Sequence, residues 1–163
     1  MLETVKYIKI NEYLPITLDG IYKNDIETLN NLEKNIKNII EAEAPLTLNT
    51  LKARLREAFG VKKISQKALD IIFPIINKLG LYTTDNLYDV VYWPSSGVFN
   101  INVLRVESDR QIDDIPHQEM KLLVDDLGCS GEELYRKILA FFGYEVLTEK
   151  ARLYLEYIEK VAK

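Results

Sequence analysis

Basic side chains are concentrated in one stretch of this chain, which has 163 residues and a formal net charge of −4. Seven lysines and arginines and only two carboxylates lie between Thr50 and Gly80. Lysine and arginine neutralise phosphates and release the counterions condensed on nucleic acid, while serine and glutamine hydrogen-bond to base edges. The residues predicted to contact DNA are Lys52, Arg54, Arg56, Lys62, Lys63, Ser65, Gln66 and Lys67. The plainer interpretation is that these lysines cover the apolar edges of solvated helices.

Aromatic residues after the basic stretch predict a second kind of contact. Tyr88, Tyr92 and Trp93 lie among β-branched residues. Rigid aromatic side chains anchor partner proteins or stack on bases, and they also pack hairpins onto a core. Between Val106 and Glu133, nine acidic residues stand against two basic ones. The alternative hypothesis is therefore a protein-docking module that uses the three aromatics or the acidic linker.

Motifs for catalysis or cofactor binding are missing from the sequence. It has neither glycine-rich phosphate-binding pattern, and its one histidine, His117, and one cysteine, Cys129, lack the spacing of a transition-metal site. The carboxylates between Glu107 and Glu133 lack the order of a calcium loop and are interpreted as a solvated face. The sequence predicts a non-enzyme without metal or cofactor.

Apolar residues at helical spacing predict the elements that position the basic stretch. The expected helices cover residues 24–44, with a capping box at Asn24, then 47–60 and 65–80, with a kink or an early break at Pro74. Two strands, over 81–83 and 87–93, complete a hairpin. Three helices and a hairpin in this order are typical of a winged helix-turn-helix, whose third helix points its N-terminal residues at DNA.

The chain also matches itself at an offset of 83 residues. Six identities recur without a gap: Leu51 and Leu134, Phe59 and Phe142, Gly60 and Gly143, Lys67 and Lys150, Ala68 and Ala151, Ile75 and Ile158. Self-similarity at a fixed period indicates one supersecondary unit used twice. The second copy is expected to begin at Pro116 and to have a capping box at Ser130 and Glu133. Because Glu145 and Val146 replace Lys62 and Lys63, we expect specific function where the copies differ.

The predicted fold is α+β and mostly helical, with two winged-helix-like repeats, the first with a hairpin wing and the second truncated. The expected segments are a lead-in with a strand (1–25), the first winged-helix-like unit (26–94), a strand and acidic linker (95–115) and a second helix-turn-helix-like unit (116–163). Apolar runs are too short to span a bilayer, so no membrane partner is predicted. The single cysteine forms no internal disulfide, which favours a cytoplasmic location.

Several short motifs resemble a known family. They are residues 39–46 (Ile-Ile-Glu-Ala-Glu-Ala-Pro-Leu), Leu51, Arg54, Phe59–Gly60, Trp93–Pro94, Ile115–Pro116, Glu119 and Gly143. Together they resemble a C-terminal domain of unknown function found in large bacterial superfamily-one helicase-like ATPases, over roughly residue 26 to the C-terminus. The resemblance implies a helicase-like ATPase partner, in cis or in trans, and implies no catalytic residues. The sequence departs from the family at Val61–Ile64, where an arginine and a small residue are more usual.

Overall fold

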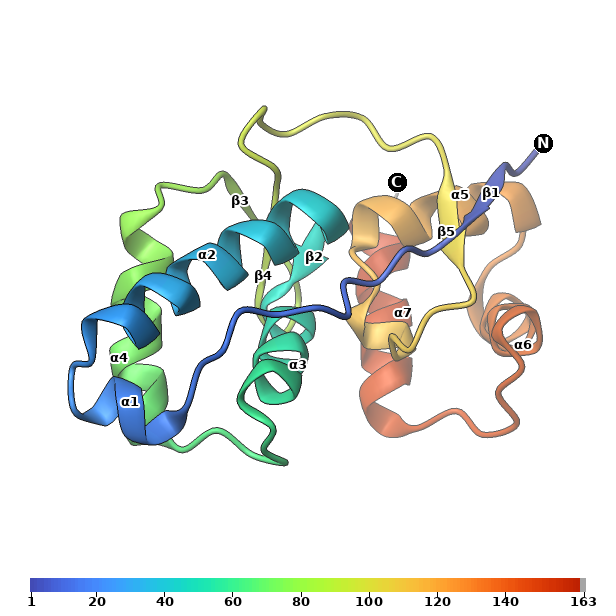
Figure 1. The fold of residues 1–163 in the computed structure, drawn as a ribbon. Coiled ribbons are helices and arrows are strands. Elements are labelled where there is room, and N and C mark those ends of the chain that lie inside the picture. The colour runs from blue at the N-terminus through green and yellow to red at the C-terminus, as the bar shows by residue number, and fades with distance from the viewer. Residues whose placement is uncertain (162–163) are drawn as a thin grey trace. The chain divides into compact units, whose positions relative to one another are not determined.

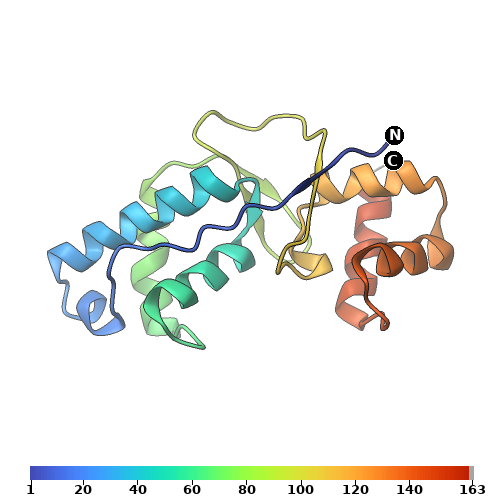
Figure 2. The same cartoon turned by 45° about the vertical axis from the view of Figure 1, so that its right-hand side comes forward.

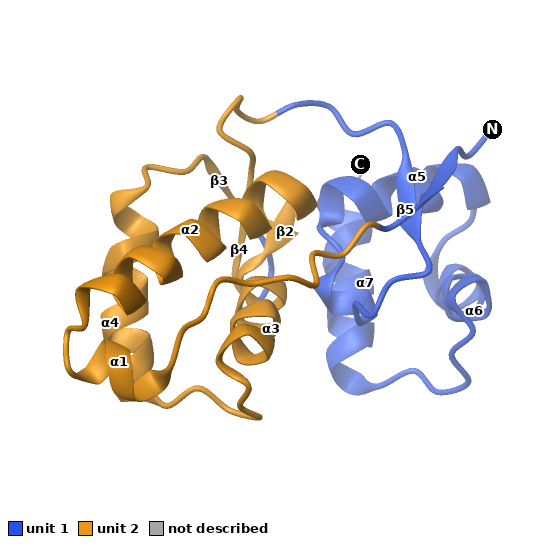
Figure 3. Ribbon diagram, in the orientation of Figure 1, with its two compact units in different colours: residues 1–7, 86–88, 99–163 blue, residues 8–85, 89–98 orange. Residues whose placement is uncertain are grey.

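The structure is a computed structural model that describes residues 1–161. It is an α+β fold with seven α-helices and two small sheets in that range. The chain divides into two compact units, coloured in Figure 3. Unit 1 comprises residues 1–7, 86–88 and 99–163, and unit 2 comprises residues 8–85 and 89–98. Residues 162 and 163, the end of the predicted second unit, lie outside the described residues. Within the described part, no helix has the length and apolar content needed to cross a membrane.

Unit 2 contains four helices and a three-stranded antiparallel sheet (Figure 1). Its elements are α1 (Leu18–Tyr22), α2 (Ile26–Glu43), β2 (Leu46–Thr47), α3 (Leu48–Phe59), α4 (Gln66–Lys78), β3 (Thr83–Asp85) and β4 (Val90–Tyr92). The strand order is β2-β4-β3, with β4 in the centre. Apolar faces of the three long helices form the core, with Ile36 from α2, Leu55 from α3 and Ile72 from α4 each fully buried. The spacing that predicted these helices is therefore also the spacing that packs them.

Unit 1 combines three helices with a two-stranded parallel sheet. Its elements are β1 (Thr4–Lys6), β5 (Leu104–Val106), the short 3₁₀ helix η1 (Ile112–Asp114), α5 (His117–Leu127), α6 (Gly131–Phe142) and α7 (Glu149–Val161). Figures 1 and 2 show β1, in dark blue, beside the yellow β5, and the register pairs Val5 with Arg105. The predicted lead-in is thus divided between the units, since residues 1–7 belong to unit 1 and residues 8–25 to unit 2.

The helix boundaries reproduce the 83-residue repeat of the sequence. Helices α3 and α6 coincide at the offset of 83 residues, and so do α4 and α7. Gly60 and Gly143 end α3 and α6 at φ values of 70° and 78°, a left-handed conformation that disfavours side chains with a Cβ atom. We call α3, the turn 60–65 and α4 the first copy, and α6, the turn 143–148 and α7 the second copy.

Several local expectations are wrong. Asp25, rather than Asn24, caps α2 through its side chain, and Ser130 makes no capping hydrogen bond to α6. Pro74 does not break α4, which continues to Lys78. The strand expected at 81–83 is displaced to β3, and the one expected at 87–93 is shortened to β4, because only those residues pair with each other. The strand expected within 95–115 is β5, which pairs with β1.

The loop between β3 and β4 belongs to unit 1. Its Asn86 places Oδ1 3.1 Å from Nδ1 of His117 and 3.2 Å from the hydroxyl of Tyr154. Its Tyr88 donates a hydrogen bond of 2.7 Å to the carbonyl of Lys150 and stacks on Tyr154, with ring centroids 6.2 Å apart. The tip of the predicted wing is therefore engaged by protein groups.

Candidate nucleic-acid interface

The predicted contact residues lie on α3, on the turn 60–65 and at the start of α4, all within unit 2. Three local features fix this arrangement. Thr47 accepts a hydrogen bond from the N–H of Thr50 and starts α3, and Gly60 ends it. Ser65 then accepts a hydrogen bond of 3.2 Å from the N–H of Ala68 and starts α4. Gly60 and Ser65 form the two helix ends that bound the turn, so its lysines are not needed to form it and are free for other contacts.

Five cations form the centre of this candidate site, which we call the basic turn: Lys52, Arg56, Lys62, Lys63 and Lys67. Lys62, Lys63 and Lys67 are exposed, whereas Lys52 and Arg56 are half-buried. None of the five forms an ion pair with any carboxylate in residues 1–161. The site therefore carries uncompensated positive charge.

Two aromatic rings hold lysines of the basic turn in place. The ammonium of Lys67 lies 4.5 Å from the ring centroid of Tyr22, and that of Lys52 lies 5.7 Å from the ring of Phe73. Cation–π contacts orient a lysine without cancelling its charge. Tyr22 was missed by sequence reasoning, because the segment before α2 showed only an irregular lead-in.

Arg54 is not part of the interface, contrary to the sequence-based prediction. Its side chain is 1% exposed, and its Nε donates to both carboxylate oxygens of Glu43 at 2.9 Å. Lys9 and the hydroxyl of Tyr13 bind the neighbouring Glu57. Burial and the nearby Glu57 raise the pKa of Tyr13, so its hydroxyl stays protonated as a donor. Arg54 is a buried member of a charged network that stabilises unit 2.

The two residues predicted to approach bases already have protein partners. The hydroxyls of Ser65 and Tyr22 lie 2.8 Å apart, and Ser65 also caps α4. The amide of Gln66 donates to Asp70 at 2.9 Å. Both side chains are exposed, so they line the surface, but reading a base requires these hydrogen bonds to be exchanged.

The aromatic residues of the alternative hypothesis are separated by the fold. Trp93 is fully buried, and its indole N–H donates to Thr84 at 2.8 Å. Tyr92 is 7% exposed, and burial raises the pKa of its hydroxyl. Both are core residues, so the prediction that they bind a partner is wrong. Tyr88 is exposed, but its hydroxyl bonds to Lys150 and its ring stacks on Tyr154, both within its own unit 1.

The second copy carries different side chains at the equivalent positions. Tyr135 and Leu139 occupy the places of Lys52 and Arg56 and are buried, while Glu145 and Val146 replace Lys62 and Lys63. Lys150 matches Lys67 but pairs with Asp113 at 3.2 Å, a hydrogen bond that raises the pKa of Lys150. At these equivalent positions, uncompensated positive charge is therefore found in the first copy alone.

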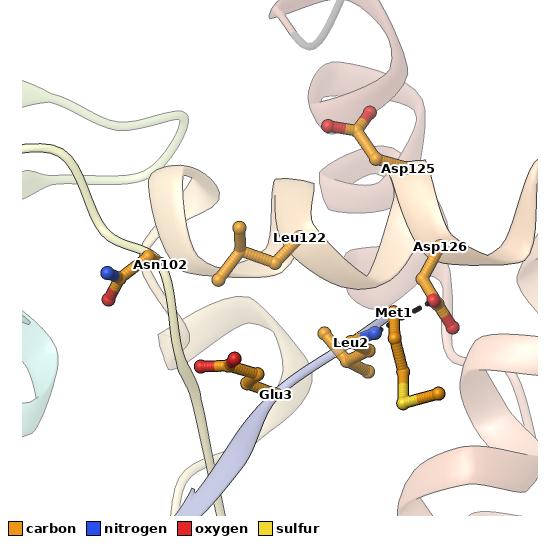
Figure 4. A pocket seen from close by; sticks show the side chains of 7 residues that line it. All are labelled: Met1, Leu2, Glu3, Asn102, Leu122, Asp125 and Asp126. Carbon is orange, nitrogen blue, oxygen red and sulfur yellow. Dashed lines mark hydrogen bonds between the residues drawn. The ribbon is translucent and has the colours of Figure 1, made fainter.

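Other polar clusters of unit 1 offer less chemistry. A hollow of about 340 Å³ is lined by Glu3, Asp125 and Asp126, but Figure 4 shows these carboxylates directed apart, with Asp126 bonded to the N–H of Leu2. The described residues contain no cluster of three His, Cys, Asp or Glu side chains able to hold a metal ion. Burial lowers the pKa of His117, which favours a neutral ring that donates from Nδ1 to Asn86.

Comparison of the chain with protein-family models, with curated proteins and with solved structures finds no match. The resemblance to the helicase-associated domain therefore stays a prediction.

Proposed function

We propose that unit 2 is a non-catalytic DNA-contacting module that grips phosphates with the basic turn. The observation that carries this proposal is the set of five cations without a carboxylate partner in the described chain. Phosphate binding by such residues is driven by counterion release, and the positive end of the α4 dipole adds to the attraction. The resemblance described above suggests that the module serves a helicase-like ATPase, in cis or in trans.

The order of elements in unit 2 supports a winged-helix interpretation. Helix α2, strand β2, helices α3 and α4 and the β3–β4 hairpin follow one another, with β2 and β3 on either side of β4. In a helix-turn-helix, the second of the two paired helices approaches DNA with its N-terminal residues. Those residues here are Gln66 and Lys67. The hairpin loop contributes no wing contact, because Asn86 and Tyr88 are bound within unit 1.

Binding without sequence preference follows from the same contacts. Ser65 and Gln66 are engaged with Tyr22 and Asp70, whereas the cations have no ionic partner. Phosphate contacts position a protein on DNA but carry no direct sequence information. We therefore expect duplexes of different sequence to bind with similar affinity at equal salt.

The chain itself supplies the variant that tests this function. Lys62→Glu with Lys63→Val introduces the residues that the second copy has at positions 145 and 146. Fluorescence anisotropy with a labelled duplex of about 20 base pairs, at about 50 mM salt, should show binding by the wild type and affinity lowered about tenfold or more in the variant.

A matched control changes the net charge equally elsewhere in unit 2. Lys34→Glu with Lys37→Val alters α2, which lies away from the turn 60–65 in both Figure 1 and Figure 2. This control should bind DNA nearly as well as the wild type. Equal losses in both variants would mean that net charge alone attracts DNA, and absence of wild-type binding would refute the proposed function.

A further inference from the structure

Unit 1 exposes large apolar side chains around the turn of the second copy, residues 143–148. The exposed fractions are 41% for Phe141, 38% for Tyr144 and 73% for Val146. Large apolar side chains gathered in one exposed patch are typical of interaction sites. We call this set the apolar turn.

A hollow adjoins the apolar turn. It has a volume of about 440 Å³ and is lined by Val106 of β5 together with Phe141, Phe142 and Tyr144. The rings of Phe141 and Phe142 meet edge to face, with centroids 4.9 Å apart. A smaller hollow, also lined by Tyr144, includes Ile112 and Val146. The patch is therefore continuous through Tyr144, and the larger hollow has room for a bulky side chain.

The charge at the rim of this patch is negative. Glu107 lines the larger hollow and Glu145 lies in the turn, and neither forms an ion pair in the described chain. Arg110 also lines the hollow, but its side chain is buried, and its guanidinium donates to both oxygens of Glu119 at 2.9–3.0 Å. Arg105 shares that carboxylate, so the three side chains together carry one positive charge against the two of Glu107 and Glu145. A ligand of the patch thus meets two uncompensated carboxylates beside an apolar surface.

Comparison of the copies shows that these side chains are not required to build the turn. The first copy has Ala58, Val61 and Lys63 where the second has Phe141, Tyr144 and Val146. The helices and the left-handed glycine are nevertheless the same in both. The exposed apolar residues therefore need an explanation other than local folding.

We propose that the apolar turn docks a cationic peptide segment of a partner protein. An aromatic or aliphatic side chain of that segment enters the hollow beside Phe141 and Tyr144, and its lysines or arginines face Glu107 and Glu145. This docking is independent of DNA binding by unit 2, because it uses residues of unit 1 alone.

Amide chemical shifts of the ¹⁵N-labelled chain test the proposal directly. The probe is an octapeptide in which lysine alternates with leucine and tryptophan, and its matched control has glutamate in place of lysine. The lysine peptide should shift amides of residues 105–110 and 141–147, and the glutamate peptide should leave them in place. No shift up to about 1 mM lysine peptide, equal shifts with both peptides, or shifts confined to other residues would overturn the proposal.

The matched variant again comes from the repeat. Tyr144→Val, Glu145→Lys and Val146→Lys together install the turn of the first copy and should weaken lysine-peptide binding about tenfold or more. Leu153→Ala, on the exposed side of α7, should leave binding unchanged.

If the triple variant does not fold, Glu107→Lys with Glu145→Lys provides the same test through charge alone. A wild-type dimer in sedimentation velocity that the triple variant converts to monomer would instead assign the patch to self-association and overturn the proposal.

Discussion

Arg54 and Lys62 carry the same charge in the first copy, yet only Lys62 faces solvent. Arg54 pairs with the fully buried Glu43, and in unit 1 Arg110 pairs in the same way with Glu119. Taking two charges out of water is costly, so a buried pair holds only while both partners remain. Helical spacing places Arg54 near Leu51 on the apolar side of α3, and this spacing indicates that Arg54 is buried. The identity of its partner could not be predicted, because it depends on how α2 packs against α3.

Arg54→Met should therefore lower the stability of unit 2. The substitution leaves the Glu43 carboxylate buried without its cation, at a cost of about 3–5 kcal/mol. Urea unfolding followed by the fluorescence of Trp93, the single tryptophan and a buried residue of unit 2, measures this loss. Adding Glu43→Leu should recover much of it, since an apolar pair of similar size is tolerated. Wild-type stability in the single variant would contradict the role given to Arg54.

Acid should weaken unit 1 through Glu119. Burial opposes ionisation of this carboxyl, but hydrogen bonds from Arg110 and Arg105 outweigh burial and hold its pKa below the usual value of 4.5. A lowered pKa stabilises the fold above the unfolded-state value, and that contribution is lost as pH falls through the folded-state value. Hydrogen exchange of the amides in β5 and α5 should therefore quicken below about pH 4.5.

The control for this pH dependence is Glu119→Gln. The variant should exchange faster than the wild type at pH 7 and should show a smaller change on acidification. An unchanged pH profile in Glu119→Gln would show that another group titrates.

At the scale of elements, α3 and α4 begin and end within a residue or two of the positions that caps, glycines and apolar spacing predict, and α6 begins directly after Ser130. Strands were less predictable, because a strand of three residues is defined by its partner. Val5 and Lys6 pair with β5 only through a contact between distant parts of the chain. Hairpin residues Tyr92 and Trp93 carry a pattern that fits both an exposed aromatic face and a core, and only packing decides between them.

Gly60, at the C-terminal end of α3, allows a prediction at this scale. Gly60→Ala should destabilise unit 2 by about 1–2 kcal/mol, because φ is 70° there and an alanine Cβ strains that conformation. No atom lies within 4 Å of an added Cβ, so the whole loss comes from the backbone. Gly60→Asn is the control and should lose less, since asparagine tolerates the left-handed region. Urea unfolding measures both, and equal stability of the alanine variant and the wild type would contradict this explanation.

For the whole molecule, the repeat indicated a duplicated scaffold, and the structure shows that its copies differ in the side chains at their turns. The basic turn of unit 2 has uncompensated lysines, and the apolar turn of unit 1 has uncompensated carboxylates beside exposed aromatics. Residue types in the repeat were sufficient to locate the first surface. They were not sufficient for the second, because helical spacing places Phe141 with the apolar residues of α6 and only the fold shows that it is exposed.

The salt dependence of DNA binding tests the central claim most directly. If all five cations of the basic turn contact phosphates, log Kobs should fall against log salt with a slope of about −4.5 for duplex DNA. In Lys62→Glu with Lys63→Val, the residual binding should have a slope of about −2.7, because three cations remain. A slope near zero, or the same slope in the wild type and in Lys62→Glu with Lys63→Val, would contradict phosphate binding by the basic turn.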